Sequence, residues 1–228
     1  MLKWLKATAF ALCFVAANSA FAGTTNNVYI DQIGSGSTID VTQHGSGNEV
    51  GNDSANTVLH GNGQSVTISQ IGTQNTHTVN VQGANATLTS TVTGDNNTTT
   101  VNCGAAPTTT CTDTSITANA TGNGNTIGIT SGAKSTMGVV LTGDNNTASV
   151  NSNTSNLMGA KADIKSSGDS NQITVSQSGP AGANGFTTKV DVTGSSNNIG
   201  VTQSGTIDSN VSIKSVGSNN GITVTSGN

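Results

Sequence analysis

The stretch Val28–Asn48, VYIDQIGSGSTIDVTQHGSGN, contains the same short pattern twice. In each copy two apolar residues, two positions apart, are followed by glutamine and then by glycine: Val28, Ile30, Gln32 and Gly34, then Ile39, Val41, Gln43 and Gly45. The two copies are offset by eleven residues (39 − 28). Because the pattern returns at about this offset along nearly the whole chain, the sequence predicts a repeat protein.

The repeat unit is Gly-x-x-Asn-x-Val/Ile-x-Val/Ile-x-Gln-x. Clear copies are GTTNNVYIDQI from Gly23, GNGQSVTISQI from Gly61, GDSNQITVSQS from Gly168 and GSSNNIGVTQS from Gly194. A spacing of two is the period of a β-strand, so alternate residues face opposite sides. Asn, Val, Ile and Gln share the predicted inner side, and the outer side holds mostly Thr, Ser, Asp and Asn. Each unit therefore predicts a short strand followed by a turn that uses glycine and asparagine.

One unit is too small to fold alone. Ordering its backbone costs on the order of 11–22 kcal/mol, whereas burying two or three Val or Ile side chains returns only about 4–8 kcal/mol. Stacking on neighbouring units must supply the difference. We therefore predict an all-β fold over residues 23–228, a β-solenoid with turns of about 22 residues that each contain two strand-turn units.

Stacked turns bring inward amide side chains of successive turns over one another. Such amide ladders satisfy polar groups that are otherwise buried without a partner. We assign this structural ladder role to Asn26, Gln32, Gln43, Asn48, Gln70, Asn75, Asn171, Gln177, Asn197 and Gln203.

The first 22 residues differ from the repeats. Lys3 and Lys6 precede an apolar run over residues 7–17, and Ala20-Phe21-Ala22 forms a small-x-small cleavage site. This is the pattern of a secretory signal peptide. We predict a mature chain from Gly23 that is secreted and works outside the cell or at its surface.

The predicted mature chain is acidic and poor in aromatic residues. It holds five lysines, no arginine and eleven acidic residues, a net charge of −6 (5 − 11). Such a chain has no basic patch for nucleic acid or for an anionic membrane surface. We expect neither a nucleic-acid partner nor a membrane span.

Insertions interrupt the period at VGNDSANTV, TTTCTDTS, NLMGA and PAGANG. Solenoids accept such additions at their corners, where they leave the stack as loops. Cys103 and Cys111 flank one insertion. In an exported chain, a disulfide closing this loop is the simplest interpretation, ahead of free thiols or a metal site.

No arrangement of residues indicates catalysis. Ser and Asp occur throughout, and nothing in their pattern indicates the preorganised pocket that catalysis needs. His44 and His60 fall in consecutive units and hence at opposite corners, which argues against a histidine metal site. The GDNN and GDSN turns lack the nonapeptide repeat of calcium-binding β-rolls. We predict a protein that is not an enzyme and has no catalytic residue, metal or cofactor.

The spacing of the amide residues resembles the curlin repeat. It shows a Gln-x4-Asn step (Gln43 to Asn48, Gln70 to Asn75) and an Asn-x5-Gln step (Asn26 to Gln32, Asn171 to Gln177, Asn197 to Gln203). The whole segment IDQIGSGSTIDVTQHGSGN, residues 30–48, also resembles the curlin repeat. Curlins are the secreted subunits of curli, the extracellular amyloid fibres of bacterial biofilms. The resemblance implies end-to-end self-assembly, a role in adhesion and matrix, and the curli secretion channel and a nucleator as partners.

The predicted ends of the solenoid favour the same function. The repeat begins at the predicted cleavage site and continues to Val224 with no charged capping segment, so both ends should offer open strand edges to another copy. We predict a structural protein that polymerises into curli-like fibres. The alternatives are a monomeric surface adhesin and a monomeric ice-binding solenoid. The latter needs a flat threonine array, whereas the outward positions mix Asp40, Glu49 and Lys189 with threonine.

Overall fold

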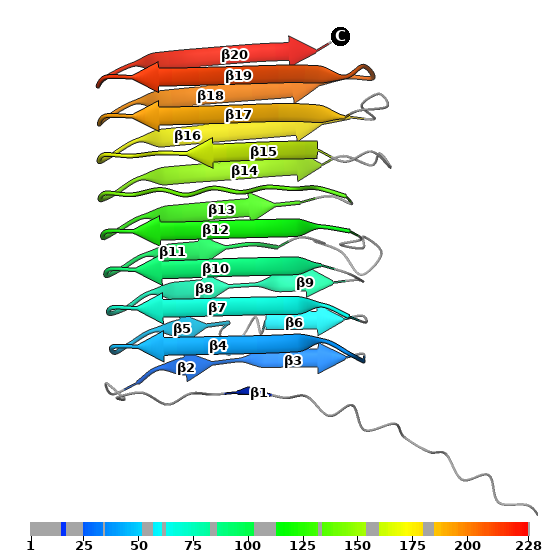
Figure 1. The fold of residues 1–228 in the computed structure, drawn as a ribbon, viewed down its shortest axis with the longest axis vertical. Helices are drawn as coiled ribbons and strands as arrows, with labels where there is room; N and C mark the ends of the chain where they lie inside the picture. The colour runs from blue at the N-terminus through cyan, green and yellow to red at the C-terminus, as the bar shows by residue number, and fades with distance from the viewer. Residues whose placement is uncertain are drawn as a thin grey trace, which may run out of the picture.

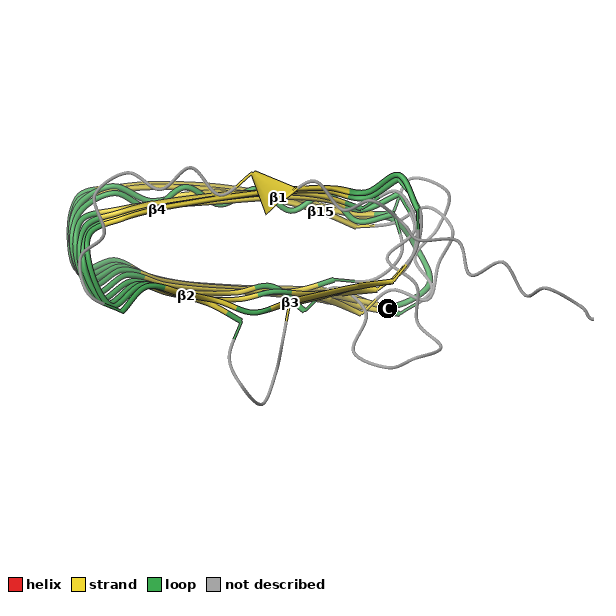
Figure 2. Cartoon of the chain, turned by 90° about the horizontal axis from the view of Figure 1, so that it is seen from below, coloured by secondary structure: helices red, strands yellow, loops and turns green. Residues whose placement is uncertain are grey.

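The chain is a β-solenoid, which confirms the predicted fold class. A computed structural model describes residues 15–16, 25–33, 35–51, 57–60, 63–82, 86–102, 113–131, 134–153, 160–179 and 185–227. Within these ranges parallel strands stack along one axis (Figure 1). Viewed along that axis, two flat layers of strands face each other and are joined by corners (Figure 2). No helix in the described ranges is long and apolar enough to cross a membrane.

One layer contains a nine-stranded sheet, called here the long sheet. Its strands are β2 (Asn27–Val28), β5 (Glu49–Val50), β8 (Thr76–Thr78), β11 (Thr98–Thr100), β13 (Thr126–Thr130), β14 (Thr147–Asn153), β16 (Gln172–Ser178), β18 (Asn198–Ser204) and β20 (Gly221–Gly227). A three-stranded sheet extends the N-terminal turns of this layer: β3 (Ile30–Ile33), β6 (Thr57–His60) and β9 (Asn80–Gln82).

The facing layer, called here the opposite layer, contains two sheets. The first comprises β1 (Val15–Ala16), β4 (Thr38–His44), β7 (Ser65–Ile71), β10 (Thr87–Thr93) and β12 (Ser115–Thr121). The second comprises β15 (Ala160–Lys165), β17 (Phe186–Thr193) and β19 (Ser209–Val216). Isolated bridges from Ser115 to Thr136 and from Thr136 to Lys161 connect the two.

Each strand pairs with the strand one turn away. Thr76 pairs with Thr98, Thr98 with Thr126, and Thr126 with Thr147, which gives offsets of 22, 28 and 21 residues (98 − 76, 126 − 98, 147 − 126). Turns therefore hold about 25 residues. The predicted 22-residue turn describes the turns without insertions, and the longer offsets span insertions such as the one after Asn102.

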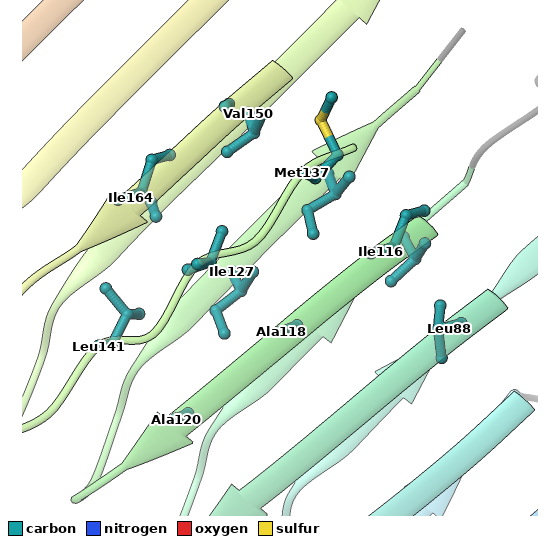
Figure 3. Close-up of a cluster of buried hydrophobic side chains, with 14 of the residues drawn as sticks. Leu88, Ile116, Ala118, Ala120, Ile127, Met137, Leu141, Val150 and Ile164 are labelled. Atoms are coloured by element: carbon teal, nitrogen blue, oxygen red, sulfur yellow. The ribbon is translucent and has the colours of Figure 1, made fainter. Parts of the chain in front are cut away.

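A thin apolar core fills the space between the layers. Leu88, Ile116 and Ala118 of the opposite layer and Ile127 and Val150 of the long sheet all belong to this buried cluster (Figure 3). All five are at most 2% exposed. The side chains along β10 alternate between exposed and buried, as a two-residue period predicts.

One corner brings the backbones of successive turns very close together. Gly94 and Gly122 lie there with φ angles of +112° and +94°. A Cβ on Gly94 would lie 2.0 Å from the carbonyl oxygen of Gly122, and a Cβ on Gly122 would lie 2.3 Å from that of Gly143. Both the positive φ and the close approach require glycine at this corner.

We expect the Gly122→Ala substitution to lower the free energy of unfolding by at least about 2 kcal/mol, because it adds left-handed strain to a steric clash. Gly128→Ala is the matched control, since a Cβ there meets no atom within 4 Å. The control should change stability by less than about 0.5 kcal/mol. Urea unfolding followed by circular dichroism measures both variants, and equal effects would contradict the role of the close corner.

Candidate functional site: the corner ladders and the open ends

Asparagine occupies the same corner in every turn. The row comprises Asn26, Asn48, Asn75, Asn97, Asn125, Asn146, Asn171, Asn197 and Asn220. The first and last members are half-buried, and the other seven are at most 1% exposed. At the other corner the equivalent position holds Ser37, Gln64, Ala86 and Thr114. The row therefore follows one corner only.

Hydrogen bonds connect each asparagine to the turns before and after it. The Asn97 backbone N–H and Nδ2 donate to Asn75 Oδ1 at 3.0 and 3.1 Å. Asn97 Nδ2 also donates to the Gly122 carbonyl oxygen at 2.8 Å, and Asn97 Oδ1 accepts from the Asn125 backbone N–H at 2.9 Å. Because all these partners lie in other turns, the buried amide is satisfied only when turns stack.

The glutamines form two separate pairs. Gln43 Nε2 donates to Gln70 Oε1 at 2.7 Å in the opposite layer. Gln177 Nε2 donates to Gln203 Oε1 at 3.0 Å in the long sheet. Neither pair continues into a long row, because Gln70 pairs in register with Val92 and Gln177 with Ser152.

The remaining predicted site residues are described only in part or not at all. Gln32 contributes its backbone to β3, and its side chain is outside the described part of the structure. Cys103 and Cys111 lie outside the described residues, so the disulfide stays a prediction.

A second row of polar side chains follows the corner glycines directly and includes the aspartates of the GDNN and GDSN turns. Asp95 Oδ1 accepts from the Thr73 backbone N–H at 2.7 Å, and Asn123 Oδ1 accepts from that of Asp95 at 2.8 Å. Asp144 and Asp169 continue the row in the same way. These aspartates cap backbone N–H groups of the preceding turn. Among the described residues, no group of three or more His, Cys, Asp or Glu is placed to hold a metal ion.

His77 is a buried histidine whose position the sequence analysis did not recognise as part of the core. Its strand neighbours in register are Val50 in the turn before and Thr99 in the turn after, and its side chain is 0% exposed. Its Nδ1 lies 3.3 Å from Ser90 Oγ, and its Nε2 has no hydrogen-bond partner. Burial lowers the pKa of the imidazole from 6.5 to about 4.

Both ends of the solenoid expose residues that are buried in every inner turn. At the C-terminal end Ile222 and Val224 are half-buried, although their register partners Ile199 and Val201 are 0% and 2% exposed. At the N-terminal end Val28 is 44% exposed, whereas its partner Val50 is 0% exposed. Among the described strands of the long sheet, β2 and β20 each pair on one side only, so part of the apolar inner face is exposed at each end.

These features define a β-solenoid repeat protein with asparagine-linked turns. The family model of the curlin associated repeat matches residues 22–49. No curated protein and no solved structure matches the chain. The match confirms the resemblance to the curlin repeat over that segment, so the chain contains a curlin repeat within a β-solenoid. Curlin repeat proteins are a structural family, typically extracellular and without enzymatic activity.

We expect the solenoid to lose stability as the pH falls from about 6.5 to about 4. Because the folded pKa of His77 is about 4 and the unfolded value is 6.5, the unfolded chain binds more protons within this window. Full protonation should remove about 3 kcal/mol of stability. Urea midpoints at pH 7 and pH 4 measure the loss.

His77→Val is the matched variant, because the neighbouring turn already holds Val50 at the equivalent position. On acidification this variant should lose about 3 kcal/mol less stability than the wild type. At pH 7 it should be at least as stable as the wild type, because it removes the unpartnered Nε2. The same loss on acidification in the variant would show that His77 does not cause it.

Proposed function

We propose that this protein is a secreted structural subunit that polymerises end to end into curli-like amyloid fibres, which serve adhesion and the biofilm matrix. The observation that carries the proposal is the half-exposed inner face at both ends, seen at Val28, Ile222 and Val224. A second copy stacked on either end would cover these residues and pair the open edge strands. The curlin associated repeat at residues 22–49 supports the same function.

The hydrogen bonds between turns suggest how two copies would join. Within the chain, each asparagine Oδ1 accepts from the backbone N–H of the next asparagine, as Asn197 does from Asn220 at 3.0 Å. At the proposed contact, Asn220 Oδ1 accepts from the Asn26 N–H of the following copy. The contact then repeats the geometry of an inner turn, and the fibre is a continued solenoid.

In this proposal, cleavage of the signal peptide during export exposes a strand edge at the N-terminal end of the solenoid. The two-residue strand β1 pairs with β4, and it lies inside the predicted signal peptide of residues 1–22. Cleavage after Ala22 would remove β1 and leave the β4 edge unpaired. The curli secretion channel and a nucleator are the partners that the resemblance implies, and the Cys103–Cys111 disulfide would close an outer loop.

A second candidate function, binding to ice, is favoured by one specific observation. On β7, β10 and β12 the outward residues lie in register, and ten of the twelve are Thr or Ser. The charged residues that argued against a threonine array lie on other strands: Asp40 on β4, Glu49 on β5 and Lys189 on β17. This function requires a protein that remains a soluble monomer.

Polymerisation is tested with the chain lacking residues 1–22, released from denaturant at neutral pH. We expect thioflavin T fluorescence to rise with time, fibres in electron micrographs, and a fibre reflection at about 4.8 Å from strands stacked along the axis. A stable, dye-negative monomer rich in β-structure would overturn the proposal. Thermal hysteresis of that monomer in the presence of ice would then support the second candidate.

The inner and outer sides should contribute differently to assembly. Asn48 Nδ2 donates to the Gly72 carbonyl oxygen at 2.9 Å, and Asn48 Oδ1 accepts from the Asn75 backbone N–H at 3.1 Å. Asn48→Ala leaves these buried groups unsatisfied, at a cost of about 1–3 kcal/mol for each group. We expect this variant to lengthen the lag phase much more than Thr42→Ala on the outer side. Equal lag phases would contradict the ladder role of Asn48.

A further inference from the structure

The outer face of the long sheet carries no charged side chain over the described residues from β8 to β20. We call this surface the uncharged face. Its outward residues on the strands and at their ends are Thr76, Thr78, Asn80, Thr98, Thr100, Asn102, Thr126, Gly128, Thr130, Thr147, Ser149, Asn151, Gln172, Thr174, Ser176, Ser178, Asn198, Gly200, Thr202, Ser204, Gly221, Thr223, Thr225 and Gly227. All are exposed or half-buried.

The outer face of the opposite layer is different. Its strands β15, β17 and β19 carry Lys161, Asp163, Lys165, Lys189, Asp191 and Lys214, and β4 carries Asp40. Neighbouring charges on this side alternate in sign, since Lys165 pairs in register with Asp191 and Asp191 with Lys214. From β7 to β20 the lysines and aspartates of the strands therefore all lie in the opposite layer, on β15, β17 and β19.

The uncharged face is also flat and regular. Thr76, Thr98, Thr126 and Thr147 stack in one row because their strands pair residue for residue. The long-sheet strands superimpose when viewed along the axis (Figure 2). The same row continues with Gln172, Asn198 and Gly221. Stacked rows of mostly short side chains are the surfaces that interdigitate when two β-sheets pack face to face.

Glycines add open notches to this flat face. A Cβ on Gly128 or Gly221 would meet no atom within 4 Å, and a Cβ on Gly200 would meet only Thr223 Oγ1, at 4.0 Å. Threonine and serine side chains stand between these notches in the same rows. The face therefore carries both small projections and places that can receive them.

We propose that the uncharged face is a lateral interface that binds a second copy of this chain, sheet against sheet. The seven strands from β8 to β20 hold 39 residues in total, and at about 3.3 Å per residue and about 4.8 Å between strands they present roughly 620 Å². Two copies would bury about 1,200 Å² in total, which lies at the lower end of the range of stable protein–protein interfaces. The binding partner is a second copy of this chain, because the rows of side chains on its uncharged face have the same spacing as the rows that they contact.

Charge favours this face over the other one for self-association. The chain without residues 1–22 carries a net charge of −6 (5 − 11), so two copies repel at long range. Contact through the uncharged face brings no like charges together and desolvates none of the lysines or aspartates. Contact through the opposite layer would desolvate the charged residues of β15, β17 and β19.

Sedimentation of the soluble chain lacking residues 1–22, before fibres form, tests the pairing. The wild type should form dimers. Thr174→Lys combined with Thr202→Lys puts two exposed charges on neighbouring strands of the uncharged face. We expect it to weaken dimerisation at least about tenfold, because like charges then meet in the interface. High salt should restore part of the loss by screening.

The matched control is Thr89→Lys combined with Thr117→Lys, which adds the same charge to paired, exposed threonines of the opposite layer. It should leave the dimer unchanged, and circular dichroism should show the same β-structure in both variants. A wild type that stays monomeric at every accessible concentration, or two variants weakened equally, would overturn the lateral interface.

Fibres provide a second measurement that separates this proposal from end-to-end polymerisation. Electron micrographs should show filaments paired side by side in the wild type and single filaments in the uncharged-face variant. Single filaments in the wild type would overturn the lateral interface and leave polymerisation standing. Soluble dimers without filaments would support the lateral interface and contradict polymerisation.

Discussion

The contact between the corner glycine of one turn and the asparagine of the turn before it supports the rest of this structure. The Asn97 amide donates to the Gly122 carbonyl oxygen at 2.8 Å, while Asn97 Oδ1 accepts from the Asn125 N–H at 2.9 Å. The corner can come this close only because glycine has no Cβ. The corner therefore sets the rise between turns and their register together, and the strand ladders follow from it.

A core this thin makes each turn dependent on its neighbours. Inward residues are mostly Val, Ile and Ala, and Phe186 is the one large aromatic side chain among the buried residues of the described ranges. An inner turn such as that of Ile199 is covered on both sides, whereas Ile222 in the last turn is covered on one side. Stability and the drive to add another turn thus have the same origin, which is the burial of a small apolar strip by stacking.

The short-range pattern in Val28–Asn48 was sufficient to predict strands, faces and a solenoid, because a two-residue period and glycine turns act locally. It was not sufficient to place the corner residues. Pairing occurs about 25 residues apart, so consecutive units fall on opposite layers, and the asparagine row follows one corner only. His77 did carry a signal, because the unit that opens at Gly72 places it at position six, where other units hold an inward Val or Ile; the structure buries it there between Val50 and Thr99. The segregation of charge emerges only when distant strands are brought into one sheet.

The asparagine row also gives the solenoid a direction. Along the chain each Oδ1 accepts from the following turn, so the C-terminal end presents the Asn220 acceptor and the N-terminal end presents the Asn26 N–H donor. Stacking the C-terminal end of one copy on the N-terminal end of the next matches donor with acceptor, as Asn197 and Asn220 do within the chain. Two C-terminal ends would place no backbone N–H of the asparagine row against either Asn220 Oδ1, so the row of bonds from backbone N–H to Oδ1 would be interrupted at that contact. Growth by the proposed contact is therefore polar, with every copy pointing the same way along the fibre.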